Sequence, residues 1–273
     1  NPMNRLSRMV RVQGGLLGQV WGHFVAPLSQ LLDICAMFHR LILGAFIGPP
    51  CIGLFFRELS RQVYFTAIRR AYILSFTSLM LGMLVIVNAT QQLVKLQGEE
   101  FVGWLLVTIV VREVGPVWAA FFVLLNSGGA ITVEIGNMSI NQEIRALKMM
   151  GIDPYRYLGV PRFWGITISL MCLYILCVFT AIIGGYLFAQ AFAEIFWAKF
   201  WLSFVNALQL MDLSVGFAKT TLFGMLIATV SLYFGFSCRT NVDEVARNTS
   251  LAAIWSLVLV GATDIILTAA YYL

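Results

Sequence analysis

Long apolar runs constrain this chain more than any other feature of its sequence. A helix that crosses a bilayer needs about 20 mostly apolar residues. Four runs meet this requirement: residues 72–94, 163–191, 216–236 and 251–272. A fifth, 101–125, is as long, but we expect Arg112-Glu113-Val114-Gly115-Pro116 to interrupt it. Only 11% of the residues are charged, against about 25% in a soluble domain. The sequence therefore predicts an all-α integral membrane protein with five transmembrane helices.

A shorter apolar stretch, 41–56, carries Pro49-Pro50 in its middle. Two prolines cannot both lie inside a regular helix without loss of backbone hydrogen bonds, and lipid makes each unpaired backbone group costly. We interpret 41–56 as an interfacial or re-entrant elbow, with a sixth span as the alternative. The chain then divides into N-terminal interfacial and elbow helices, 1–70, and a five-span domain, 71–273.

The basic residues indicate an orientation. With five spans and a cytoplasmic N-terminus, fourteen of the eighteen Lys and Arg residues fall on the cytoplasmic side. The outer set holds only Lys95, Arg112, Lys199 and Lys219. Because cytoplasmic loops are enriched in Lys and Arg, the sequence predicts N-in and C-out.

A polar island, 137–162, separates two of the spans. Ser139 followed by Gln142 has the spacing of a capping box, which starts a helix, and Gly151 with Asp153-Pro154 is typical of a helix end. We therefore predict a short amphipathic cytoplasmic helix at 139–150. Its apolar face would hold Ile140, Ile144 and Leu147, and its polar face Asn141, Arg145 and Lys148. It is either an interfacial loop helix or a coupling helix that docks into a cytoplasmic partner.

Charged residues within apolar runs are the other candidates for function. Arg112 and Glu113 lie about 100° apart on a helix, so they need not bond each other. Charges at this depth usually pair, face a cavity or mark a ligand path, and a guanidinium suits a lipid phosphate. Alternatively, 101–111 forms a separate outer helix and leaves the pair at a water boundary. Asp264 and Glu134 have no partner identifiable from the sequence.

No pattern typical of catalysis, cofactor binding or metal binding is present. The chain has no Walker A loop and no HExxH, GxSxG or CxxC motif. Its basic residues do not form the solvated patch of a nucleic-acid binder. We expect no catalytic site, no metal and no cofactor, so energy from ATP would come from another subunit.

Three segments resemble the MlaE/YrbE family of ABC permeases. They are 112–116 (REVGP), 134–138 (EIGNM) and 146–162 (ALKMMGIDPYRYLGVPR), and the resemblance covers roughly residues 40–273. It departs from the family at Arg145 and Lys148, where acidic residues are usual, at Asn126, where an Arg is common, and at 240–247, which replaces a Gly-rich segment.

The resemblance implies a homodimeric permease in the bacterial inner membrane, with its C-terminus in the periplasm. It implies a cytoplasmic ABC ATPase, a periplasmic MCE-domain protein and a STAS-domain protein as partners, and phospholipid or a related lipid as cargo moved between inner and outer membranes. Arg112 and Glu113 would bind lipid. The residues expected to couple to the ATPase are Ile140, Ile144, Arg145, Leu147, Lys148, Met150 and Asp153.

Two other classes of function remain open at this point. One is an ion-coupled secondary transporter with Asp264 as the coupling acid, although such transporters usually contain inverted repeats and none is evident. The other is a membrane scaffold that moves no lipid, which predicts that Arg112→Ala leaves lipid movement unchanged.

Overall fold

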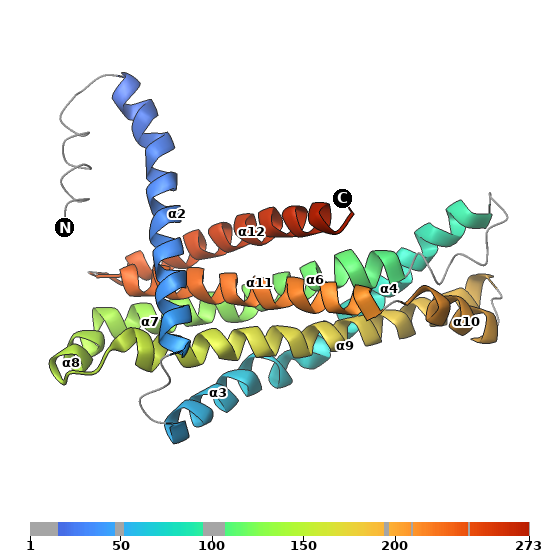
Figure 1. Cartoon of the computed structure of the whole chain (residues 1–273), viewed down its shortest axis with the longest axis horizontal. Coiled ribbons are helices and arrows are strands. Elements are labelled where there is room, and N and C mark those ends of the chain that lie inside the picture. Colours follow the sequence, from blue (N-terminus) through green and yellow to red (C-terminus); the bar gives the residue numbers. More distant parts are fainter. Residues whose placement is uncertain are drawn as a thin grey trace.

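The computed structural model describes residues 16–46, 52–94, 107–193, 197–208, 210–239 and 241–272, and within these ranges every regular element is a helix (Figure 1). Among these described residues, five stretches are long and apolar enough to cross a membrane, which confirms the fold class and agrees with the five expected spans. These stretches are Phe55–Asn88, Val107–Ile140, Tyr155–Gln190, Met211–Ser237 and Val242–Tyr271.

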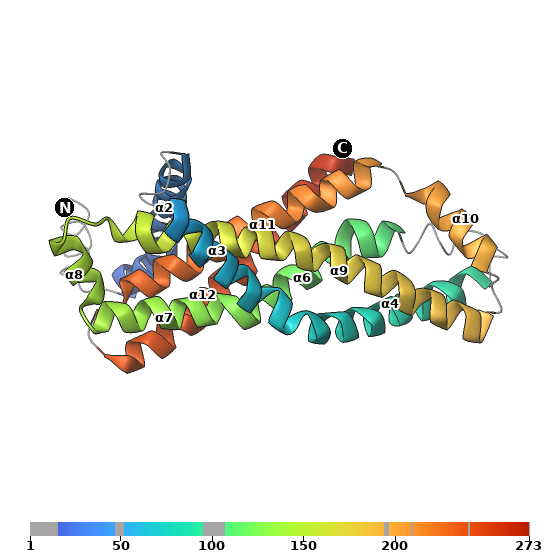
Figure 2. The same cartoon turned by 90° about the horizontal axis from the view of Figure 1, so that it is seen from below.

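The spans form an elongated bundle centred on two helices, α9 (Val160–Ala193) and α11 (Leu210–Ser237). α9 packs against α4 (Ala71–Val94) and α11, and α11 also contacts α12 (Val242–Tyr272). Figures 1 and 2 show α9 and α11 side by side along the long axis. The core between these two helices holds Phe163, Ile166, Leu170, Phe223 and Ile227.

Two glycines allow α4 and α9 to touch through their backbones. A Cβ atom at Gly82 would lie 1.9 Å from the carbonyl oxygen of Ala181, and one at Gly184 would lie 2.2 Å from that of Leu79. Small residues at such crossings are typical of membrane helices, whose association depends on close van der Waals packing.

We expect Gly184→Ala to destabilise the bundle, because its methyl group meets backbone that can move only by separating the helices. Overpacking of this kind costs about 1–3 kcal/mol, which would appear as a lower midpoint of thermal unfolding in detergent. Gly261→Ala is the matched control, since nothing lies within 4 Å of its added Cβ. Equal midpoints for both variants would contradict the α4–α9 contact.

The second span continues through the predicted interruption, so that expectation was wrong for the residues described. The run consists of η3 (Val107–Val114), α6 (Gly115–Val123), η4 (Leu124–Gly128) and α7 (Gly129–Ile140). η3 and η4 are π-helical. Pro116 lies in the first turn of α6, where a missing N–H does no harm, and the wider turn of η3 precedes it. The start of the expected separate helix, 101–106, lies outside the described residues.

The N-terminal helices precede the bundle. α2 (Leu16–Phe46) lies across its long axis (Figures 1 and 2) and contacts α11. α3 (Ile52–Thr66) continues through η1 (Ile68–Arg70) into α4, so the first apolar helical stretch begins at Phe55 rather than at residue 72. The prolines of the predicted elbow, within 47–51, lie outside the described residues. The division at residue 70 stays a prediction.

The helix predicted at 139–150 is shorter. Ile140 ends α7, and α8 covers only Glu143–Met149. The capping box was wrong, because the Ser139 hydroxyl donates to the Cys238 carbonyl at 2.6 Å instead of capping α8, and Gln142 adopts a left-handed φ of 62°.

The predicted end of this helix is confirmed. Gly151 has a φ of +78°, its N–H donates to the Lys148 carbonyl at 3.1 Å, and the Ile152 N–H donates to the Leu147 carbonyl at 3.0 Å. This pair of bonds is a Schellman motif, in which glycine is favoured at the left-handed position.

Candidate functional site

A two-point ion pair links the second and fourth spans at the end of the bundle opposite α8. Arg112, on η3, places Nε 2.9 Å from Oδ1 of Asp212 and Nη2 3.1 Å from Oδ2. The Tyr271 hydroxyl, on α12, donates to Oδ1 of Asp212 at 3.1 Å, and its ring centroid lies 5.8 Å from the guanidinium. The Asp212 side chain is fully buried. The fork of an arginine matches a carboxylate in this way, so three spans are tied at one point.

A second group of charged and polar side chains surrounds Lys219, on α11. Its Nζ lies 2.9 Å from Oε2 of Glu113 and 3.0 Å from Oδ1 of Asp264. Nζ also donates to Oγ1 of Thr268 at 2.7 Å and to the Arg112 carbonyl at 3.2 Å. The Thr268 hydroxyl in turn donates to Oε2 of Glu113 at 3.0 Å. Lys219 is 1% exposed, so its charge depends wholly on these oxygens.

We call these seven residues the ion-pair network: Arg112, Glu113, Asp212, Lys219, Asp264, Thr268 and Tyr271. With all groups ionised it carries two positive and three negative charges. Its interior is closed, but Glu113 and Asp264 remain 33% and 21% exposed. Burying charge is costly unless partners and hydrogen bonds compensate it, and in apolar spans such groups are usually functional. The network therefore leaves two of its carboxylates, Glu113 and Asp264, partly exposed at the surface of the junction.

The sequence predicted part of the network. Arg112 and Glu113 do not bond each other, as expected, and each pairs with a different residue of α11. Asp212 and Lys219 were missed as network residues, since Lys219 was counted in the outer set and Asp212 was not singled out, although both lie on α11, which begins at Leu210. A signal was present. Asp212 and Lys219 are seven residues apart and so share one helix face, as do Asp264, Thr268 and Tyr271.

A separate ion pair lies nearer the α8 end. Arg162 Nη2 on α9 lies 2.9 Å from Oε1 of Glu134 on α7, and the Arg162 side chain is only 4% exposed. Glu134 thus has the partner that the sequence did not identify. At the same end, burial raises the pKa of the Cys238 thiol.

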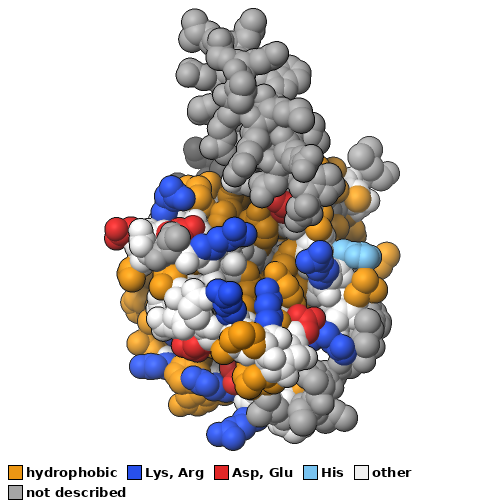
Figure 3. Space-filling model, turned by 90° about the vertical axis from the view of Figure 1, so that its left-hand side faces the viewer, with side chains coloured by type: hydrophobic (Ala, Val, Ile, Leu, Met, Phe, Trp, Pro, Cys, Tyr) orange, Lys and Arg blue, Asp and Glu red, His pale blue; other side chains and the backbone are white. Residues whose placement is uncertain are grey.

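α8 presents its predicted faces. Ile144 is buried and Leu147 packs against the core, whereas Arg145 and Lys148 are exposed. Met149 and Met150 are 78% and 65% exposed. Figure 3 shows this end of the molecule, where basic side chains lie among acidic and apolar ones.

The remaining predicted coupling residues lie at the ends of this region. Ile140 is half-buried at the end of α7, and exposed Asp153 accepts a hydrogen bond from the Tyr155 N–H at 3.1 Å. Within the ranges that the structure describes, no three His, Cys, Asp or Glu side chains converge as metal ligands would.

Comparison with known proteins assigns the family. The family described as Permease MlaE matches residues 59–270, which cover nearly the full length of the five spans, α8 and every residue of the ion-pair network except Tyr271. The chain belongs to the MlaE permease family. This MlaE-family chain is thus a multi-pass membrane protein and an ABC transporter permease, a class of subunit that works with an ATPase partner.

Three relatives show the range of the resemblance. The intermembrane phospholipid transport system permease protein MlaE of Haemophilus influenzae is 29% identical, over 90% of this chain and 97% of the relative. A probable ABC transporter permease protein of Rickettsia typhi is 26% identical, over 90% and 94%. The chloroplastic protein TRIGALACTOSYLDIACYLGLYCEROL 1 of Arabidopsis thaliana is 24% identical, over 79% and 62%.

Proposed function

We propose that this MlaE-family chain is the permease subunit of an MCE-type ABC transporter that moves phospholipid or a related lipid between inner and outer membranes. One observation carries the proposal. α8 is a short helix with exposed Arg145, Lys148, Met149 and Met150, held between the second and third spans, and the second span carries Arg112 and Glu113 of the ion-pair network. A partner that pushes on α8 would therefore move both helices that flank it.

The proposed assembly is a homodimer in the bacterial inner membrane, with α8 and the N-terminus cytoplasmic and the C-terminus periplasmic. The exposure of α12 favours contact with a second copy or with lipid, since only 17% of its most apolar window is buried. The ATPase would dock on α8, where the residues proposed to couple are Ile140, Ile144, Arg145, Leu147, Lys148, Met150 and Asp153. The further partners are a periplasmic MCE-domain protein and a STAS-domain protein.

We retain Arg112 and Glu113 as the residues proposed to bind the lipid, but the role of Arg112 is refined. The guanidinium of Arg112 is already neutralised by Asp212, and its side chain is 14% exposed. Its first role is therefore to hold the junction, and contact with a headgroup would come at the exposed edge. Arg112→Ala is expected to reduce ATP-dependent lipid transfer in proteoliposomes at least about tenfold, the effect of losing about 1.4 kcal/mol. Unchanged transfer by an intact complex would favour a scaffold.

The proposed function and an ion-coupled transporter predict different results for a substitution at Asp264. Asp264 is one of two carboxylates that pair with Lys219. In Asp264→Asn the lysine still pairs with Glu113, and the net charge of the network changes from −1 to zero. We expect ATP-driven lipid transfer to fall no more than about threefold, under 1 kcal/mol. Complete loss of transfer, together with dependence on a proton or sodium gradient in the original protein, would instead identify Asp264 as a coupling acid.

A further inference from the structure

A second polar site lies between α3, η4 and α7, apart from the ion-pair network. It is a pocket of about 230 Å³. Its lining is contributed by α3, η1, η4 and α7 and includes Glu58, Arg61, Arg69, Arg70, Asn126 and Glu134. Fourteen residues of one helical run separate Asn126 from Arg112, which corresponds to about 20 Å. The two sites therefore lie at different depths along the bundle.

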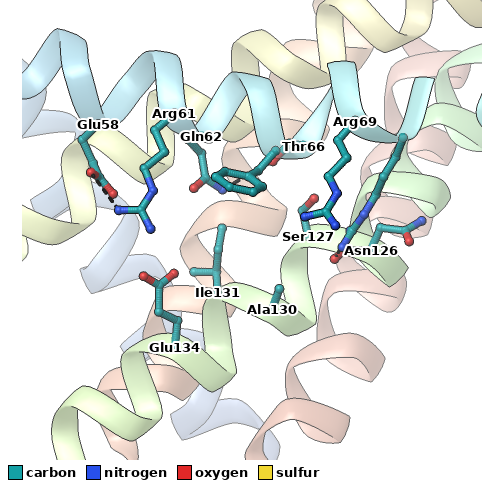
Figure 4. Close-up of a pocket in the computed structure, with 12 residues that line it drawn as sticks. Glu58, Arg61, Gln62, Thr66, Arg69, Asn126, Ser127, Ala130, Ile131 and Glu134 are labelled. Atoms are coloured by element: carbon teal, nitrogen blue, oxygen red, sulfur yellow. Dashed lines mark hydrogen bonds and ion pairs between the residues drawn. The ribbon is translucent and has the colours of Figure 1, made fainter. Parts of the chain in front are cut away.

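The pocket carries an excess of positive charge. Figure 4 shows Arg61 and Arg69 pointing across it towards Glu134 and Ser127. Glu134 is already neutralised by Arg162 at 2.9 Å. Glu58 lies 3.8 Å from Arg61, and both side chains are partly exposed, so that pair is weak. The three guanidiniums that line the pocket therefore outnumber the one remaining carboxylate, Glu58, which pairs with Arg61 alone among them.

The arginine side chains are held in place by an aromatic ring and a backbone carbonyl, neither of which carries a full negative charge. Arg61 and Arg69 each lie 5.9 Å from the centroid of the Phe65 ring, and Arg70 Nη1 donates to the Asn126 carbonyl. In the part of the chain that the structure describes, neither Arg69 nor Arg70 has an acidic side chain within ion-pair distance. Several guanidinium donors therefore remain for an anion with multiple acceptor oxygens, as phosphate has.

An apolar stripe leads away from the pocket along the first span. Its members recur every four residues, so each lies next to the following one on the helix surface and together they form a continuous apolar ridge. All are exposed: Ile68 63%, Tyr72 72%, Phe76 61%, Met80 54% and Leu84 62%. The stripe begins beside Phe65 and Arg69, so one ligand could place an anionic group in the pocket and hydrocarbon chains on the stripe.

We propose that this pocket binds the phosphate of a glycerophospholipid headgroup, with the acyl chains along the stripe. The lipid character of the ligand rests on the proposed function, whereas the anionic character rests on the pocket alone. By the orientation proposed above, the pocket lies in the half of the bundle nearer the cytoplasm. It is then a headgroup site on the cytoplasmic side, separate from the network near the outer end. Basic pockets between membrane helices bind phospholipid headgroups in this way.

The test is native mass spectrometry of the full chain in detergent, with any subunits that co-purify, titrated with dioleoyl phosphatidylglycerol. We expect saturable binding, and at least about tenfold weaker binding by Arg69→Gln/Arg70→Gln, which loses charge-assisted hydrogen bonds. Arg57→Gln is the matched control, because it removes an exposed charge of α3 outside the pocket. Equal binding by the double variant and the original chain would overturn the proposal.

A gain of affinity cannot result from misfolding, so Glu58→Gln is the second variant. It removes the carboxylate that pairs weakly with Arg61 and so frees that guanidinium, and we expect about threefold tighter binding of phosphatidylglycerol. Dioleoylglycerol, which lacks the phosphate, should not bind the pocket, and inorganic phosphate at millimolar concentration should compete only weakly. Retention of dioleoylglycerol, or full displacement by inorganic phosphate, would refute a lipid headgroup site.

The outcome is separable from that of the proposed function. Loss of arginine-dependent binding with intact ATP-driven lipid transfer would reject this pocket and leave the transporter standing. Arginine-dependent phosphatidylglycerol binding by a chain that moves no lipid would reject the transporter and leave the pocket.

Discussion

Lys219→Met is expected to prevent the chain from accumulating as a folded protein, the largest effect of any single substitution considered. Lys219 is 1% exposed and holds Glu113, Asp264 and Thr268. Without it, two carboxylates remain in an apolar junction of three spans without a cation. Removing one partner of a buried ion pair costs about 3–5 kcal/mol, a large share of the stability of most domains. Monodisperse yield in detergent and the midpoint of thermal unfolding measure the effect.

A compensated variant separates the loss of charge balance from the loss of the side chain itself. In Lys219→Met/Glu113→Gln/Asp264→Asn the site contains no unpaired charge, so most of the lost stability should return, because a neutral, well-packed replacement is often tolerated. Lys148→Met is the control for the loss of an exposed lysine. If Lys219→Met alone unfolds at the original temperature, the ion-pair network does not hold the spans together.

Arg145→Glu/Lys148→Glu is expected to abolish co-purification of the ATPase and ATP-driven lipid transfer while the permease itself stays folded. Both side chains are exposed on α8, so the substitutions leave the core unchanged. A reversed charge at an interface turns attraction into repulsion, which costs several kcal/mol. Two reversals should lower the affinity at least about a hundredfold, or 2.7 kcal/mol. Affinity purification from membranes and a transfer assay on the same preparation measure both effects.

Arg57→Glu/Arg247→Glu makes the same change in net charge at exposed positions outside α8. It should preserve both co-purification and transfer. An intact, active complex with the reversed α8 would show that the ATPase docks elsewhere.

The apolar runs predicted the fold because lipid leaves so few alternatives. A stretch of about 20 apolar residues in a bilayer must be helical to satisfy its backbone, and the five helical stretches follow from that. The interruption expected at Arg112–Pro116 was wrong because the local helix geometry accommodates the proline. In the structure, π-helical η3 precedes it and Pro116 occupies a first turn, neither of which leaves a periodic signal.

The site was less predictable because its members come from three spans. Arg112 and Glu113 stood out as charges in an apolar run, but their partners on α11 and α12 depend on helix rotation and packing. The start of α8 was misplaced because Ser139 bonds the Cys238 carbonyl, a contact between residues far apart in the sequence. Its end was predicted correctly because Gly151 acts through its own backbone conformation.

Photocrosslinking from position Met149 tests the central claim most directly. This side chain is 78% exposed at the end of α8, so a benzophenone amino acid placed there should not disturb the core. Crosslinking in native membranes should attach an ATP-binding subunit on the cytoplasmic side, and Lys148→Glu should weaken that product. Attachment of a periplasmic protein, or of none, would contradict the claim that α8 connects an ATPase to the spans.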